Sequence, residues 1–434
     1  MNKIKRFFTR HTWMFIIIAI MIFVPQSFNY QAKLNSRIIV SGLAIDKTDD
    51  MYEVTAQIVM PTSGSEAGGL GAKLDFVSEV GNSVAEGVQK IAYKVGKNAG
   101  LSHANFVILG QSMLEENIVS HLDYFVRYAE VSPAITLMFC DGSAKDMIAQ
   151  TKNLELSVGI SLQKLFINKE LSLSGVVMPV IEFINGAFNQ SKSSLASGIY
   201  MAPEGDAGLN SNAKAEDSKQ GVQGSSSQEQ ATEQQSSAGS GQSGGSEQDK
   251  NTRIKYYNDV YYFKAGKYIN KMDSESEILG MFWADDFANA GDFNITHVSG
   301  GVLDDATIGL ELTRKRTSSR VDFKNGHPVL VFNVELKDLQ ISEIMNRGLP
   351  TLSLYDKRDK STLSLIEEKV KEKVEKDIKS AFEKAKIDQV DIFDISEKAY
   401  QRDAKGWDEY IEKYGEAYIN NCVVEVNVNI KNIN

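Results

Sequence analysis

Cysteine is almost missing from this sequence. The 434 residues include two cysteines, Cys140 and Cys422, which stand far apart in the chain. No Cys-x-x-Cys pair occurs, and none of the five histidines belongs to an HxxxH pair, so no spacing in the chain indicates a zinc site. Cys140 ends an apolar run and is expected to be a buried free thiol, whereas Cys422 precedes a predicted strand.

Positive charge is also in short supply. The chain has 47 Lys and Arg against 57 Asp and Glu, which gives a net charge of −10. Binding to a phosphate backbone depends on clustered Lys and Arg, so nucleic acid is excluded as a partner of the whole chain. The hydrophobic fraction of 42% is that of a globular protein long enough for two or three domains.

Aromatic residues are missing from Met201 to Lys255. Within that stretch, residues 204–250 consist mainly of Ser, Gln, Glu and Gly, which cannot bury enough apolar surface to offset the entropy of ordering. We expect a disordered tract that either separates two domains or is a loop inserted into one compact assembly. The string GQSGG, Gly241–Gly245, matches a nucleophile elbow around Ser243, but no predicted strand precedes it as that motif requires.

One long apolar run occurs at the N-terminus. Trp13–Val24 is uninterrupted and follows a basic flank that contains Lys3, Lys5 and Arg6. This order is typical of an export signal or a signal anchor with its positive end in the cytoplasm. No good cleavage site and no lipidation cysteine follows, so residues 1–30 are interpreted as an uncleaved anchor and the remainder as extracytoplasmic.

Residues 33–200 are expected to form an N-terminal α/β domain. It begins with a hairpin of Arg37–Asp46 and Tyr52–Met60, followed by an amphipathic helix over Asp75–Lys97 because valines recur at spacings of three and four. The pattern then predicts strands at Asn105–Gly110 and Ala134–Cys140, and helices at Met113–Glu130 and Ser143–Gln150.

Two further units are expected after the polar tract. Residues 254–300 form a small middle domain with a hairpin that turns at Ala265-Gly266 and a short helix. Residues 301–434 supply three strands, the last two turning at Asn325-Gly326, and then one helix of roughly 25 residues from Ser364, with an apolar stripe. With the alternating strand Val423–Ile430, this unit is predicted to be an antiparallel sheet packed by a long helix. The fold class is therefore α+β, in three extracytoplasmic domains.

The sequence contains only isolated fragments of catalytic motifs. SLQK, Ser161–Lys164, matches S-x-x-K, but the partner motifs S-D-N and K-T-G are missing. The remaining candidates are expected to be structural or surface groups, and no catalytic, cofactor-binding or metal site is predicted. They are the loop glycines Gly68, Gly69 and Gly71, the acidic pairs Asp285-Asp286 and Asp304-Asp305, and His103.

Several stretches together resemble the Ger(x)C family, the C subunits of nutrient germinant receptors in endospore-forming bacteria. VSGLAIDK, Val40–Lys47, looks like the first hairpin of the family. SHANFVILGQSMLEENIVSHLDYFVR is similar to its histidine-led strand, glycine and helix, here with His103, Gly110 and Arg127. DVYYFKAGKYINKMDSESEILGMFW, the DIF tripeptide at Asp391, Trp407 and the last strand complete the resemblance.

The resemblance implies a non-enzymatic subunit on the extracytoplasmic face of the spore inner membrane. It would contact integral-membrane subunits of the A and B types; binding of a small-molecule germinant by this subunit is left open. Two features depart from the family, the missing lipidation cysteine and the polar tract. The alternatives are a cell-envelope structural or assembly protein and an enzyme that uses Ser161 and Lys164.

Overall fold

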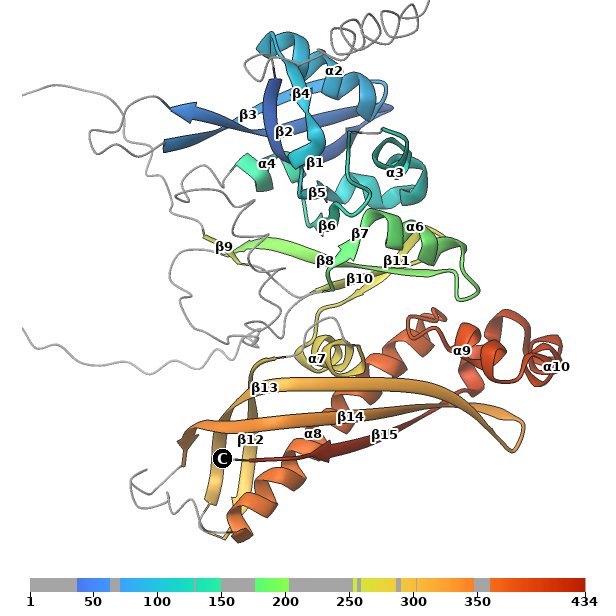
Figure 1. Cartoon of the computed structure of the whole chain (residues 1–434). Helices are drawn as coiled ribbons and strands as arrows, with labels where there is room; N and C mark the ends of the chain where they lie inside the picture. The colour runs from blue at the N-terminus through green and yellow to red at the C-terminus, as the bar shows by residue number, and fades with distance from the viewer. Residues whose placement is uncertain are drawn as a thin grey trace, which may run out of the picture.

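The computed structural model describes residues 37–62, 71–128, 130–149, 176–202, 253–255, 259–285, 290–301, 303–346 and 360–433 (Figure 1). The predicted anchor and the polar tract lie outside these ranges. Among the described residues, no helix is long and apolar enough to cross a membrane. The described chain forms two sheets, with the first above the second in Figure 1.

The first sheet has the strand order β11-β10-β8-β6-β5-β1-β2-β3. Its centre, β8-β6-β5-β1, is parallel, while β2, β3, β10 and β11 are added antiparallel at the two sides. The strands are β1 Arg37–Thr48, β2 Met51–Thr62, β3 Gly71–Gly81, β5 Phe106–Leu109, β6 Thr136–Cys140, β8 Ser193–Ala202, β10 Val260–Lys264 and β11 Lys267–Met272. Three short strands pair with its central strands: β4 Asn98–Gly100 with β1, β7 Met178–Pro179 with β6, and β9 Arg253–Lys255 with β8.

Helices cover both faces of this sheet. In β5, Val107 and Leu109 belong to the main core, while Phe106 and Ile108 point to a smaller cluster on the opposite face. A strand buried on both faces is expected in the parallel centre of an α/β sheet. The main-core face carries α2 Val84–Val95, α3 Ile118–Arg127 and α6 Val180–Phe188, and the other face carries α4 Ala144–Ala149.

The predicted single helix over Asp75–Lys97 is wrong in its first part. Residues up to Gly81 form the strand β3, and α2 begins only after Ser83, whose hydroxyl accepts a hydrogen bond from the Glu86 backbone N–H at 3.2 Å. The Glu86 carboxylate accepts in return from the Asn82 backbone N–H at 2.8 Å. Ser83 is thus the N-cap of α2, and the Glu86 carboxylate bonds to the residue before the N-cap, a variant of the capping box that stabilises a helix start at this point.

The second sheet has the order β12-β13-β14-β15. Its strands are β12 Gly291–Gly300, β13 Leu303–Lys324, β14 His327–Met345 and β15 Val423–Ile430, so two long strands replace the three expected from 301 to 340. The prediction of an antiparallel sheet is wrong for β15, which pairs parallel to β14. The helices between β14 and β15 provide the crossover that parallel neighbours require.

Both predicted hairpin turns are confirmed. Asn325 and Gly326 have φ of 54° and 78°, and Ala265 and Gly266 have φ of 50° and 77°. Two successive residues at positive φ are characteristic of the type I′ turn, whose twist matches that of the strands it joins.

The long helix is α8, Lys360–Ile387, which begins four residues before the predicted Ser364. Its apolar stripe is confirmed: every member is at most 1% exposed, namely Ile366, Val370, Val374, Ile378, Phe382 and Ala385. α7, Glu275–Ala284, packs closely on α8, because a Cβ at Gly280 would lie 2.1 Å from the Asp377 carbonyl oxygen. The chain then forms α9 Ile395–Arg402, α10 Ala404–Tyr414 and a 3-10 helix at Gly415–Asn421 before β15.

Residues 254–300, expected to form a middle domain, are shared between the two sheets. β10 and β11 extend the first sheet, α7 packs on α8, and β12 joins the second sheet. Both ends of the polar tract lie in the first sheet, where Ala202 pairs with Arg253 across β8 and β9. The chain therefore leaves the first sheet before the polar tract and re-enters the same sheet after it. The division of the chain into separately folding domains stays a prediction.

Candidate functional site

The structure does not bring the sequence candidates together. Ser161, Lys164, Ser243 and the glycines Gly68 and Gly69 lie outside the described residues, as does Asp286, and Gly71 begins β3. His103 is exposed at the end of a 3-10 helix, Leu101–His103. In the described part of the chain, no group of three His, Cys, Asp or Glu residues is placed to hold a metal ion.

The acidic pair Asp304-Asp305 lies at the start of β13, beside the irregular end of its pairing with β12. Asp305 has φ of 46°, and its carboxylate lies 2.7 Å from Nδ1 of the exposed His297. The Asp304 backbone N–H donates to the side-chain oxygen of Asn346 at 2.8 Å. These contacts agree with the expectation of surface and turn acids.

Both cysteines are buried and free, as expected for Cys140. Burial raises the pKa of the Cys140 thiol, and it raises the pKa of the Cys422 thiol to about 12. Because the thiolate is the nucleophile, neither side chain is set up for covalent chemistry at neutral pH.

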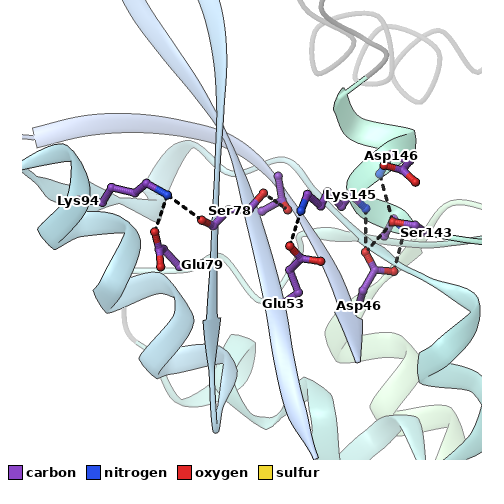
Figure 2. A network of polar contacts seen from close by, with 10 residues as sticks. Asp46, Glu53, Ser78, Glu79, Lys94, Ser143, Lys145 and Asp146 are labelled. Atoms are coloured by element: carbon purple, nitrogen blue, oxygen red, sulfur yellow. Dashed lines mark hydrogen bonds and ion pairs between the residues drawn. The ribbon is translucent and has the colours of Figure 1, made fainter. Parts of the chain in front are cut away.

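Asp46 occupies the carboxyl end of β1, the edge where parallel α/β sheets usually bind ligands. Its Oδ1 accepts from the Ala144 backbone N–H at 2.8 Å, and its Oδ2 accepts from the Lys145 backbone N–H at 2.8 Å and from the Ser143 hydroxyl at 3.2 Å (Figure 2). A Cβ at Gly110 would lie 1.9 Å from Asp46 Oδ1. The position that an anion could take at the start of α4 is therefore filled by the protein's own carboxylate.

A hollow of about 560 Å³ follows the outer side of β3. Lysines border it from both faces, and those drawn in Figure 2 are each paired: Lys94 Nζ lies 2.6 Å from Glu79 Oε1, and Lys145 Nζ lies 2.5 Å from Glu53 Oε1. The hollow is lined by Glu53, Phe76, Val77, Ser78, Glu79, Val80, Lys90, Lys94 and Lys145. The third lysine of the lining, Lys90, pairs at 2.8 Å with Glu86 just outside the hollow, so each lysine has a carboxylate partner and the hollow does not present a strong field of one sign.

A second hollow of about 450 Å³ lies between α2 and α3 and is lined by Tyr52, His121 and Arg127. His121 Nδ1 is 2.7 Å from the Tyr52 hydroxyl, and His121 Nε2 is 3.1 Å from Glu116 Oε2 in a geometry too bent for a good hydrogen bond. Burial lowers the pKa of the His121 imidazole, while the Glu116 carboxylate acts in the opposite direction. His121 is therefore a neutral buried group that joins α3 to β2.

The loop between α8 and α9, residues 388–394, connects the second sheet to the first. We call it the joint loop. Polar groups near β8, β10 and β11 bind it, and buried apolar side chains of both sheets form one continuous core. The contacts are Tyr262 hydroxyl and Asn270 Nδ2 (3.0 Å) to the Asp388 carboxylate, Lys264 Nζ to the Gln389 carbonyl (3.2 Å), Ser193 Oγ to the Asp391 carbonyl (2.6 Å) and Ser191 Oγ to Asp394 Oδ1 (2.8 Å).

The DIF tripeptide quoted for the resemblance is the centre of this joint loop. The buried Asp391 carboxylate accepts from the backbone N–H groups of Ile395 and Ser396, at 2.7 and 2.8 Å, and from the Tyr418 hydroxyl at 2.9 Å. Burial raises the pKa of the Asp391 carboxyl, and these donors act in the opposite direction. Phe393 packs edge-on against Phe332 of β14. The motif thus starts α9 and attaches the joint loop to the second sheet.

Two family models match the chain one after the other, and the second includes β10 and β11 of the first sheet together with the whole second sheet. Residues 30–199 match the spore germination protein N-terminal domain, and residues 258–434 match the spore germination B3/GerAC-like C-terminal domain. The chain belongs to the Ger(x)C family. The crystal structure of the GerBC protein is similar to this member with 17% identity and a TM-score of 0.47, over 90% of this chain and 96% of that chain. A comparison with curated proteins finds no match.

Sequence reasoning missed the buried carboxylates that organise this Ger(x)C protein. Asp46 stands inside the quoted VSGLAIDK stretch, but no sequence signal says that it caps a helix almost a hundred residues later. Asp377 is 1% exposed in α8, and the sequence analysis did not single it out. The burial of Asp377 could have been predicted from the sequence, because it lies three residues after Val374 and next to Ile378 on the apolar stripe.

Proposed function

We propose that this protein is a non-enzymatic C-type subunit of a nutrient germinant receptor and that it acts through contacts with integral-membrane subunits of the A and B types. The observation that carries the proposal is the match of both family models, over residues 30–199 and 258–434.

The use of the ionisable groups supports a role in binding rather than catalysis. The Asp46 and Asp391 carboxylates each accept backbone N–H groups at the start of a helix, and the Asp377 carboxylate accepts from Trp283 and Ser276. Groups held in this way stabilise the fold and are not poised to exchange protons with a substrate.

We propose that Trp13–Val24 attaches the protein to the membrane and that the remainder of the chain lies on the extracytoplasmic side. Ger(x)C proteins are generally attached through a lipid, and this chain has no cysteine directly after its apolar run. Mass spectrometry of the membrane-extracted protein should recover peptides from residues 1–30. A soluble protein with a mature N-terminus near Lys33 would contradict the anchor.

Deletion of the gene tests the proposed function directly. Spores should lose their response to one class of nutrient germinant, while sporulation and germination by agents that bypass nutrient receptors continue. Affinity isolation from spore membranes should recover two multi-span membrane proteins. Normal nutrient germination of the deletion strain, with an altered envelope, would instead favour a structural or assembly role.

Three substitutions test the non-enzymatic part. Ser161→Ala, Lys164→Ala and Ser243→Ala should each leave the germination response unchanged, because these residues match nucleophile motifs in sequence alone. Loss of germination in Ser161→Ala, at normal abundance and folding of the protein, would return the acyl-transfer hypothesis to consideration.

A further inference from the structure

β3 is the last strand on one side of the first sheet. It pairs with β2 over its full length, from Gly71 to Gly81, and within the described ranges no strand pairs with its other side. An edge strand directs the N–H and C=O groups of alternate residues away from its partner, and such a row can accept another strand. β3 is long enough for this, because strands of five or six residues are common.

Two lysines from α2 bind backbone carbonyls of this edge. Lys90 Nζ donates to the Val80 carbonyl oxygen at 2.8 Å, and Lys94 Nζ donates to the Ser78 carbonyl oxygen at 3.3 Å. Ser78 and Val80 are two residues apart, so their carbonyls point to the same side of the strand. The two lysines therefore occupy carbonyl oxygens to which the backbone N–H groups of an added strand would donate.

The position of α2 makes these contacts possible. α2 lies close against β2, because a Cβ at Gly87 would be 2.6 Å from Val54 Cγ2. Lys90 and Lys94 are one helical turn apart and extend from this helix toward the edge. Their ammonium groups also pair with carboxylates, Lys90 with Glu86 at 2.8 Å and Lys94 with Glu79 at 2.6 Å, which holds them there.

The space beside the edge of β3 is open. The ion pair of Lys145 and Glu53 lies on the face of the sheet opposite α2, as Figure 2 shows. The hollow of about 560 Å³ therefore lies along the strand edge itself. Besides β3 itself it is lined by the side chains of Lys90, Lys94 and Lys145, so movement of these flexible side chains would open the strand edge further.

β3 is self-complementary for antiparallel pairing. In a register centred on Ser78, Phe76 stands opposite Val80 of a second copy, an aromatic and β-branched pair of the kind that stabilises sheets. Glu79 then faces Val77, and Asp75 faces Gly81, so no two like charges are directly opposite. Val80 is 38% exposed and available for such a contact.

We propose that Lys90 and Lys94 keep the free edge of β3 closed, and that without them a second copy of this chain pairs antiparallel with β3. These contacts prevent edge-to-edge association of two sheets, and they come from a helix that packs on the same sheet. This role is independent of the proposed part in germination.

The test compares two matched double variants of the full chain in detergent. The edge variant is Lys90→Met/Lys94→Met. The control is Lys371→Met/Lys379→Met, which removes two lysines that pair with glutamates one turn away on α8, at 2.6 and 2.5 Å. Both variants change net charge and apolar surface equally. An Ala pair at residues 90 and 94 separates the loss of the ammonium groups from the added methionine surface.

Sedimentation equilibrium should show that both edge variants self-associate about tenfold or more tightly than the control and the wild type. Hydrogen exchange of the 71–81 peptide should slow as the concentration of the edge variants rises, and not in the control. Adding Val80→Lys, at an exposed edge position, should return association to the control level. Equal dissociation constants in edge variant and control, or association without protection of residues 71–81, would overturn the proposal.

Discussion

The indole N–H of Trp283 donates a hydrogen bond to the carboxylate of Asp377 at 3.1 Å, deep between α7 and α8. The Ser276 hydroxyl donates to the same carboxylate at 2.7 Å, and Lys373 Nζ lies 3.3 Å from it. A buried carboxylate with this many donors is costly to remove, because the donors then remain buried without an acceptor.

Asp377→Ala is accordingly expected to lower the free energy of unfolding by about 3 kcal/mol. Asp123→Ala is the control, since Asp123 is an exposed helical carboxylate paired with Arg127 and should cost under about 1 kcal/mol. Denaturant unfolding monitored by tryptophan fluorescence measures both. Equal midpoints would show that the Asp377 network contributes nothing to stability.

The two faces of α8 should respond differently to substitution. Val374 is completely buried, so Val374→Asp places an uncompensated charge in the core and should cost several kcal/mol, roughly 3–5. Glu372 is an exposed partner of Lys369, and Glu372→Gln should cost well under about 1 kcal/mol. Thermal unfolding of the two variants checks this, and similar midpoints would contradict the assignment of the faces.

The joint loop offers a test of coupling between the two sheets. Ser193→Ala removes a buried donor from the Asp391 carbonyl and should cost about 1 kcal/mol, with faster hydrogen exchange across residues 388–394. Ser120→Ala removes a similar bond, to the Asn117 carbonyl, at an exposed position and should change neither quantity. Unaltered exchange in the joint loop of Ser193→Ala would mean that this bond does not hold it.

Glu116→Gln should lower the pKa of His121 further, because the Glu116 carboxylate raises that pKa against the larger effect of burial. NMR titration of the imidazoles measures this, with the other four histidines as internal references. Since the pKa of His121 is lowered in the folded state, its contribution to stability is present above its usual pKa near 6.5 and is lost as pH falls through the folded-state value. An unchanged or raised pKa in Glu116→Gln would refute the pairing.

Shortening the polar tract should not harm the fold. Ala202 and Arg253 are paired, so a short Gly/Ser turn in place of residues 204–250 can close the same strand pair. Each halving of the loop lowers its closure cost by about 0.6 kcal/mol, so stability should stay equal or rise slightly. A marked loss in the unfolding midpoint would show that the tract contributes contacts of its own.

The sequence by itself determined the features that depend on neighbouring residues. Asn325-Gly326 predicts its turn because positive φ is required at both positions, and the spacing of Val370, Val374 and Ile378 predicts which side of α8 is buried. The family could also be predicted from short stretches in a particular order. VSGLAIDK lies in β1 and DIF in the joint loop, and each stretch keeps its local structure close to its own residues.

The tertiary structure decided everything that depends on which distant segments meet. Valines spaced by three and four fit a helix through Val77 and Val80, but β2 offers β3 a complete set of backbone partners, and the Ser83 N-cap begins the helix only at Val84. The alternating pattern of Val423–Ile430 is the same in parallel and antiparallel pairs, so its direction depends on where α8 to α10 return the chain. The pairing of β10 with β8 likewise arises from packing between segments far apart in sequence.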